Sequence, residues 1–275
     1  MKQRVISAIV AAVIVIPILI IGGIPFALGI GVLAALALHE VMNLNKKDRP
    51  YTTLMKVLGF VSLELLVFNR YDGGFINLGV NNLAICLPAL ALLIPSIFYK
   101  NDEYTTKDAF YLFGAVMVLG TFFNALIVMC NTPTGMIAGQ WKLLYLFLIA
   151  SMTDTFAMII GCLIGKHKLI PRVSPKKSIE GSIAGSVVGT AIASIYYYNI
   201  IGDLNIFVLI GMTLLLSILG QIGDLFFSKI KREHDIKDFS NIMPGHGGIL
   251  DRLDSFTFIV FGYIAITSIL SIIIR

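Results

Sequence analysis

Apolar runs long enough to cross a membrane dominate the chain. They extend over about 16 to 22 positions each and are separated by short polar connections. Since a helix rises about 1.5 Å per residue, about 20 apolar residues cross a hydrocarbon core about 30 Å thick. The pattern predicts an all-α, polytopic integral membrane protein with about nine transmembrane helices. We expect these helices at 5–22, 24–42, 53–69, 83–98, 109–130, 143–164, 182–198, 205–226 and 253–274.

Composition agrees with this prediction. Hydrophobic residues make up 57% of the 275 residues, charged residues make up 13%, and the mean hydropathy is +0.88. Soluble domains are nearer to half apolar and a quarter charged. The first run follows the sequence MKQR, but no A-x-A-like cleavage site comes after it and a second run follows almost at once. These features favour an uncleaved anchor over a signal peptide.

The basic residues predict the orientation of the helices. If the N-terminus is cytoplasmic, only Arg70, Lys142 and Arg275 of the 21 lysines and arginines fall on the outer side. Cytoplasmic loops carry such an excess, so we expect the N-terminus inside, the C-terminus outside and a location in the cell (inner) membrane. The net charge of +5 mainly reflects this topology and does not indicate a nucleic-acid partner.

Polar chemistry is concentrated in the second half of the chain. We expect one region of about five helices at 1–140, and a catalytic region of about four at 141–275 with cytoplasmic loops 165–181 and 227–252. Asp154 falls inside the predicted sixth helix and Asp224 at the end of the eighth. A carboxylate at membrane depth costs a few kcal/mol on insertion scales, so such residues usually face a polar cavity or a partner.

Residues 228–255, SKIKREHDIKDFSNIMPGHGGILDRLDS, place an unusual mixture of side chains between two apolar helices. Their cations suited to phosphate are Lys231, Arg232, Lys237 and Arg252. Glycines that let backbone approach a ligand are Gly245, Gly247 and Gly248. Hard oxygen ligands suited to Mg²⁺ are Asp224, Asp251 and Asp254. Cations interleaved with carboxylates favour a metal–phosphate site over a patch that binds anionic lipid.

Several residues allow two interpretations. His246 fits a structural turn and a phosphate donor equally well. The loop GKHKLIPRVSPKKSIEG at 165–181 fits a second part of the site, with a turn at Ser174 and a helix cap at Ser178, but also a basic cytoplasmic loop. Glu40, with its neighbour His39, is expected to form a polar interface rather than to act in catalysis.

The stretch at 228–254 closely resembles the signature of phosphatidate cytidylyltransferases, also called CDP-diacylglycerol synthases. The matching positions are Ser228, Ile230, Lys231, Arg232, Lys237, Asp238, Ser240, His246, Gly247, Gly248, Ile249, Asp251, Arg252, Leu253 and Asp254. SPKKSIEG at 174–181 is similar to the S-P-K-K-T-x-E-G loop of that family, with Ser178 in place of the commoner Thr. Asp154 also matches, whereas Met158 stands where the family has an aromatic residue.

The resemblance implies a metal-dependent nucleotidyltransferase that converts CTP and phosphatidate to CDP-diacylglycerol and diphosphate. It implies Mg²⁺ as cofactor, leaves a second metal or a monovalent cation open, and suggests a homodimer. The implied metal ligands are Asp224, Asp251 and Asp254. The implied catalytic residues are Asp224, Asp251, Lys231, Arg232, His246 and Arg252. The implied nucleotide-binding residues are Ser174, Lys176, Lys177, Glu180, Lys237, Gly247 and Gly248.

The sequence leaves three alternatives. A related enzyme would transfer the cytidylyl group to an isoprenoid phosphate, and a lipid kinase would phosphorylate a lipid alcohol. A transporter with midplane carboxylates is disfavoured, because the charges of this chain lie at one face, beyond the ends of the predicted helices.

Overall fold

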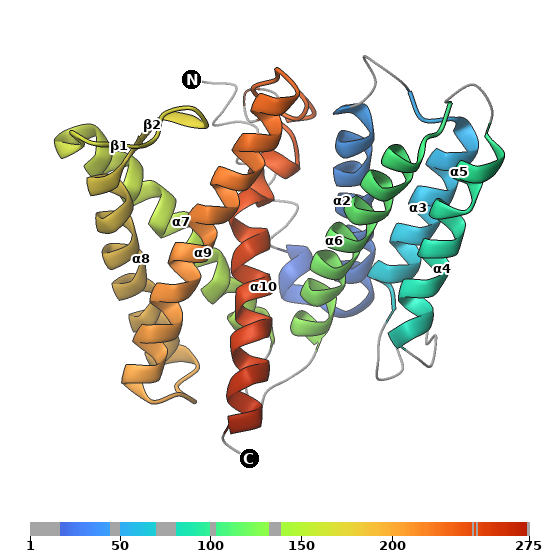
Figure 1. Ribbon diagram of the computed structural model, residues 1–275. Helices are drawn as coiled ribbons and strands as arrows, with labels where there is room; N and C mark the ends of the chain where they lie inside the picture. The colour runs from blue at the N-terminus through green and yellow to red at the C-terminus, as the bar shows by residue number, and fades with distance from the viewer. Residues whose placement is uncertain are drawn as a thin grey trace. The chain divides into compact units, whose positions relative to one another are not determined.

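The computed structural model describes residues 17–44, 50–69, 81–99, 103–131, 139–243, 245 and 247–273, which are almost entirely helical (Figure 1). Six helices of this part of the chain are long and apolar enough to cross a membrane. They are α2 (Gly23–Leu44), α6 (Thr106–Asn131), α7 (Gly139–Ile164), α8 (Ile179–Ile200), α9 (Ile206–Glu233) and α10 (Leu250–Ile273). The predicted all-α, polytopic membrane protein is therefore confirmed.

Three shorter helices correspond to the predicted spans 53–69 and 83–98. They are α3 (Thr53–Val67), α4 (Asn81–Leu93) and α5 (Pro95–Phe98). Pro95 separates α4 from α5, because proline has no backbone N–H and is tolerated best at the first turn of a helix. Most of the predicted first span lies outside the described residues. The number of crossings and their orientation stay predictions.

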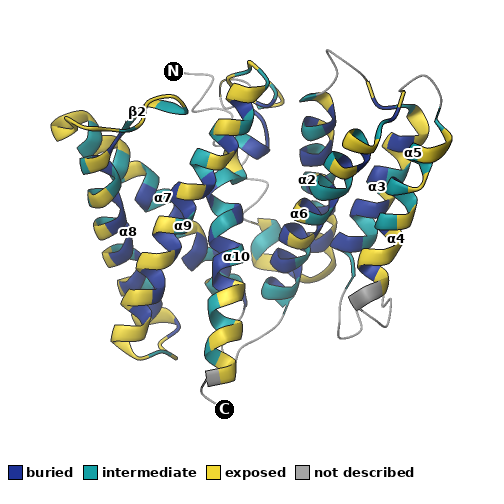
Figure 2. Cartoon of the chain, in the orientation of Figure 1, coloured by how far each residue is buried: buried dark blue, intermediate teal, exposed yellow. Residues whose placement is uncertain are grey.

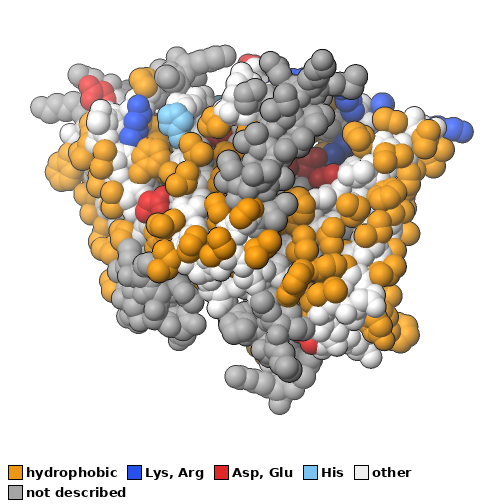
Figure 3. Space-filling model, turned by 180° about the vertical axis from the view of Figure 1, so that it is seen from behind, with side chains coloured by type: hydrophobic (Ala, Val, Ile, Leu, Met, Phe, Trp, Pro, Cys, Tyr) orange, Lys and Arg blue, Asp and Glu red, His pale blue; other side chains and the backbone are white. Residues whose placement is uncertain are grey.

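The exposed faces of the long helices are apolar, as a lipid environment requires. On α8, Ile183, Val187 and Ile195 are each more than half exposed. The face drawn in Figure 3 likewise shows hydrophobic side chains over the helix surfaces. Buried and exposed residues alternate around the long helices in Figure 2, so each of these helices has one side packed in protein.

The chain divides into two compact units. The first contains residues 1–131 together with the distant segment 239–250, and the second contains 132–238 and 251–275. In the first unit, the side-chain amide of Asn124 on α6 donates to the carbonyl of Val67 at 3.0 Å and to that of Asn69. These bonds tie α6 to the end of α3.

In the second unit, α7 and α8 pack closely through small residues. A Cβ atom added at Gly185 would lie 2.6 Å from the carbonyl oxygen of Thr153, and one at Gly189 would lie 2.5 Å from its hydroxyl. Small residues at a helix crossing let backbones approach within a membrane, where there is no hydrophobic drive between helices. The glycines of α8 thus fix its distance from α7.

Buried hydroxyls and an amide join α7, α8 and α9. Thr153 and Ser217 share a hydrogen bond of 2.8 Å, and the Ser217 hydroxyl donates to Ser186 at 3.2 Å. Gln221 also donates to the hydroxyl of Ser186, at 2.7 Å. Such bonds satisfy polar groups that have no water to pair with in a bilayer. Gln221 lies one turn before Asp224, so this network supports the helix that carries a predicted metal ligand.

The predicted loop 165–181 contains an antiparallel hairpin of β1 (Lys168–Ile170) and β2 (Ser174–Ser178). The expected turn at Ser174 was wrong, because the turn occupies 171–173 and Ser174 begins the second strand. The predicted cap was right. Ser178 ends β2, and its hydroxyl accepts the N–H of Gly181 at 3.2 Å, which starts α8.

The predicted loop 227–252 is shorter than expected, because α9 continues to Glu233. Lys231 and Arg232 lie in its last turn, where cations interact favourably with the helix dipole. The Ile236 N–H then bonds the Lys231 carbonyl at 2.9 Å, while Asp235 adopts a left-handed conformation with φ 52°. This arrangement ends the helix as a Schellman motif.

Candidate active site

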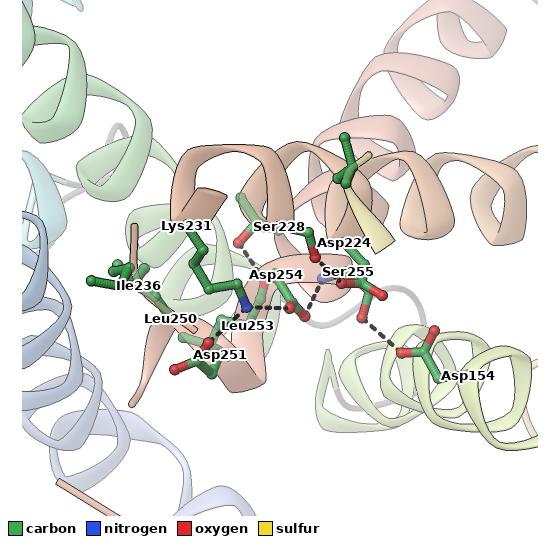
Figure 4. Close-up of polar contacts among 12 residues, drawn as sticks. Asp154, Asp224, Ser228, Lys231, Ile236, Leu250, Asp251, Leu253, Asp254 and Ser255 are labelled. Carbon is green, nitrogen blue, oxygen red and sulfur yellow. Dashed lines mark hydrogen bonds and ion pairs between the residues drawn. The ribbon is translucent and has the colours of Figure 1, made fainter. Parts of the chain in front are cut away.

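Three helices of the second unit bring carboxylates into one cluster. Asp154 comes from α7, Asp224 from α9 and Asp254 from α10, and the backbone N–H of Ser255 donates to Asp254 at 2.8 Å. The Ser255 hydroxyl donates to Asp154 at 3.1 Å (Figure 4). The Ser228 hydroxyl donates to Asp224 at 3.2 Å. Like charges gathered in this way favour the binding of a cation.

Lys231 lies between two of the predicted metal ligands. Its Nζ atom is 2.7 Å from Oδ1 of Asp251 and 4.0 Å from Oδ2 of Asp254 (Figure 4). One ammonium group thus reaches both carboxylates, which lie three residues apart on α10. Only 10% of the Lys231 side chain is exposed, so this is a buried ion pair.

Lys177 joins the hairpin to the carboxylate cluster. It lies on β2, and its Nζ atom is 2.5 Å from Oδ2 of Asp224. The exposed fractions of the two side chains are 24% and 23%. The sequence predicted that Lys177 would bind nucleotide, and the structure places it against a predicted metal ligand. The pair therefore connects the first polar loop to α9, the helix that leads into the second.

The chemistry of the cluster fits Mg²⁺, which prefers carboxylate oxygens and completes its coordination with water and phosphate. Among the described residues, no three His, Cys, Asp or Glu side chains converge closely enough to enclose an ion. Asp254 lies beside Asp224, whereas Asp251 lies against Lys231 (Figure 4). That Asp224 and Asp251 share a metal ion stays a prediction.

Most of the other predicted cations are exposed to solvent. Arg232 donates to the carbonyls of Val173, at 3.4 Å, and Ile236, at 3.0 Å. The remaining exposed cations are Lys176, Lys237 and Arg252. Ser174 is half-buried at the start of β2. These side chains border the hairpin and the ends of α9 and α10, and their roles stay predictions.

Glu180, predicted to contact nucleotide, fixes the base of the hairpin. Its carboxylate accepts the backbone N–H groups of Lys166 and His167, each at 3.2 Å, and lies 2.6 Å from Nδ1 of His167. The Glu180 carboxylate is therefore already bonded to groups of the protein itself. A direct contact with nucleotide stays a prediction.

The glycine-rich segment belongs to the first unit and forms a tight turn. Gly245 and Gly247 have φ angles of 78° and 84°, which residues other than glycine rarely adopt. Met243 and Gly247 exchange backbone hydrogen bonds of 2.9 and 3.1 Å, so the Gly247 N–H is already paired. The turn geometry explains both glycines without a ligand. The phosphate contacts predicted for Gly247 and Gly248 stay predictions, and His246 lies outside the described residues.

Asp154 is the cluster member to which the sequence assigned no role. Two signals singled it out: its match to the family, and its position inside an apolar helix, where a carboxylate requires a partner. The partner, Ser255, lies 101 positions away. Local patterns cannot connect residues at that separation.

Comparison with known proteins decides the family. A sequence model described as the cytidylyltransferase family matches residues 2–270. The chain belongs to this family. Among proteins named phosphatidate cytidylyltransferase, that of Staphylococcus aureus (strain COL) is 34% identical over 260 residues, covering 94% of this chain and 96% of its own. That of Bacillus subtilis (strain 168) is 32% identical over 265 residues, covering 94% and 95%. That of Staphylococcus haemolyticus is 35% identical over 263 residues, covering 94% and 96%.

Proposed function

We propose that this protein transfers the cytidylyl group of CTP to phosphatidate, giving CDP-diacylglycerol and diphosphate. The observation that carries the proposal is the cluster of carboxylates on three membrane helices, paired with Lys177 and Lys231, in a member of the cytidylyltransferase family. Relatives across nearly the whole chain bear the name of this activity.

The reaction requires no nucleophile from the protein. A phosphate oxygen of phosphatidate attacks the α-phosphorus of CTP. The bond from that phosphorus to the oxygen that bridges to the β-phosphate breaks, and diphosphate leaves with the electron pair. Catalysis then consists of orienting the two phosphates and stabilising the charge that they share in the transition state.

The residues of the cluster suit those two tasks. Asp224, Asp251 and Asp254 would hold Mg²⁺, which when bound neutralises phosphate oxygens and polarises the attacked phosphorus. Lys177 and Lys231 now neutralise the carboxylates, and both ammonium groups are in position to pair with phosphate oxygens that enter the site. Each lysine would pair with a carboxylate when the site is empty and with a phosphate when substrate is bound. Neither state would then leave a buried charge without a partner.

The exposed cations would act at the border of the site. We assign Lys176 and Lys237 to the triphosphate of CTP, and Arg232 and Arg252 to phosphate oxygens, because guanidinium groups bind these bidentately. His246, Ser174, Glu180 and the backbone at Gly247–Gly248 complete the predicted nucleotide contacts.

The proposed active site faces the cytoplasm. The positive-inside distribution supports a cytoplasmic active site, where CTP is available, and phosphatidate would enter from the bilayer. We also propose a homodimer, on the basis of the resemblance.

Product analysis tests the proposal against its alternatives. With CTP labelled at the α-phosphate and phosphatidate in detergent, we expect the label in CDP-diacylglycerol and unlabelled diphosphate in solution. A kinase would leave labelled CDP in solution and no cytidine on the lipid. An isoprenoid-specific enzyme would be inactive on phosphatidate and active on the isoprenoid phosphate, and either result would overturn the proposal.

A further inference from the structure

Glu40 holds the glycine-rich segment in place from a distant part of the sequence. It lies near the end of α2, and only 1% of it is exposed. Its Oε1 atom accepts the Ser240 hydroxyl at 2.6 Å and the Ile249 N–H at 2.8 Å. Its Oε2 atom accepts the Leu250 N–H at 2.9 Å. One carboxylate therefore binds both ends of the segment 240–250.

Glycine at position 248 is required by the same carboxylate. A Cβ atom added to Gly248 would lie 2.7 Å from both Cδ and Oε2 of Glu40, much closer than ordinary van der Waals contact. Gly248 does not have a positive φ angle, so an alanine there would be excluded by the contact with Glu40 and not by its own backbone. The Ser240 hydroxyl and the missing side chain at Gly248 are thus explained by a residue that lies outside the segment.

The bonds to Ile249 and Leu250 also determine where α10 begins. The first N–H groups of a helix have no partner within it and are usually capped by a nearby side chain. Here the cap comes from Glu40, about 210 positions earlier. Asp251 is the next residue after Leu250, so the start of the helix sets the direction in which this predicted metal ligand projects.

We propose that Glu40 is a positioning residue for the reaction: by bracing Ser240, Gly248 and the first turn of α10, it holds Asp251 and the glycine-rich turn in the productive arrangement. This inference rests on the proposed function, because it assigns Glu40 an effect on that chemistry. Glu40 itself contacts no reacting atom in this account.

Substitution by glutamine gives the most direct test. Glu40→Gln keeps the size of the side chain but replaces one carboxylate oxygen by an NH₂ group. Because NH₂ cannot accept a hydrogen bond, the bonds to one of the two oxygens are lost whichever way the amide is turned. We expect kcat to fall about 100-fold, the scale of a misplaced catalytic group, while the KM for phosphatidate changes less than about threefold. Glu103→Gln is the matched control, since Glu103 is exposed in the same unit, and it should behave as wild type.

Two further measurements keep the result interpretable. Hydrogen exchange should accelerate about tenfold at the amides of Ile249 and Leu250 in Glu40→Gln and remain unchanged in Glu103→Gln. This readout is independent of activity. If the wild-type protein lacks the proposed activity but its Ile249 and Leu250 amides exchange more slowly than those of Glu40→Gln, the proposed function is wrong. The structural role of Glu40 at the start of α10 is then still supported. If Glu40→Gln does not fold, Ser240→Ala, which removes one of the three bonds, gives the same comparison with a smaller loss.

Gly248→Ala separates positioning from a general loss of stability. Alone it should reduce kcat strongly, because its Cβ collides with the carboxylate. In the Glu40→Ala background the collision is gone, so Gly248→Ala should add less than about a twofold further loss. Independent losses that multiply in the double variant, or wild-type kcat in folded Glu40→Gln, would overturn the proposal.

Discussion

The Nζ atom of Lys231 lies 2.7 Å from Oδ1 of Asp251, and the exposed fractions of the two side chains are only 10% and 5%. Lys231 lies in the last turn of α9 and Asp251 in the first turn of α10, so the pair joins the two helices where the chain leaves and re-enters the apolar region. Because this buried cation contacts a predicted metal ligand, we expect substitutions at the pair to change both the stability of the protein and its activity.

The carboxylate of Asp251 should be required for turnover and not for folding. In Asp251→Asn we expect kcat to fall at least about 100-fold, because a charged group near the phosphates is lost at constant size. The protein should still elute from size exclusion in detergent as wild type does. Asp235→Asn is the control, since Asp235 is exposed and Asn also tolerates its positive φ. Near-normal turnover in Asp251→Asn would remove this residue from the metal site.

Removal of Lys231 should destabilise the protein through the carboxylates that it leaves behind. An unpaired buried charge costs about 3–5 kcal/mol, so Lys231→Met should lower the thermal midpoint by several degrees. The double variant Lys231→Met/Asp251→Asn should regain part of that stability but remain inactive. Lys229→Met is the control, because 65% of the Lys229 side chain is exposed. Recovery of activity together with stability would show that Lys231 acts only in structure.

The adjacent lysines of β2 should differ in their effects. Successive side chains of a strand point to opposite faces, and only Lys177 pairs with Asp224. We expect Lys177→Met to reduce kcat about 100-fold, and Lys176→Met mainly to raise the KM for CTP several-fold. Steady-state kinetics at varied CTP measures both values. Equal effects of the two substitutions would contradict the prediction that Lys177, through its pair with Asp224, has a role different from that of Lys176.

Asp154 should influence metal binding through Asp224. We expect Asp154→Asn to raise the Mg²⁺ concentration for half-maximal activity several-fold, because it removes one negative charge from the cluster. The rate at saturating Mg²⁺ should change less. Asp203→Asn serves as the control, since Asp203 pairs with Lys142, away from the cluster. A Mg²⁺ dependence identical to that of wild type would exclude Asp154 from the metal site.

The sequence predicted the helices well because their signal is local. Except at the end of α9, apolar length located the long helices within a few residues, and the hydroxyl of Ser178 located the start of α8. The end of α9 was missed because apolar character stops near 226, while Lys, Arg and Glu are good helix formers and continue the helix to Glu233. The end of hydrophobicity was mistaken for the end of the helix.

The site was predictable in its residue types and not in its pairings. The motif indicated that Lys177, Asp224 and Lys231 matter, but the contact between Lys177 and Asp224 joins residues 47 positions apart. Glu40 is the extreme case, since its partners lie 200 to 210 positions away. Only the folded chain brings these groups together, so a sequence pattern can suggest a polar role for Glu40 without naming what it binds.

One assay tests the central claim, that these carboxylates support metal-dependent transfer of a cytidylyl group to lipid. Purified protein is incubated with CTP labelled in the cytosine ring, phosphatidate and Mg²⁺, and the label extracted with lipid is counted. We predict extractable label that vanishes with EDTA and returns with excess Mg²⁺. Transfer that persists undiminished in EDTA, or no lipid-bound label under any condition, would contradict the account.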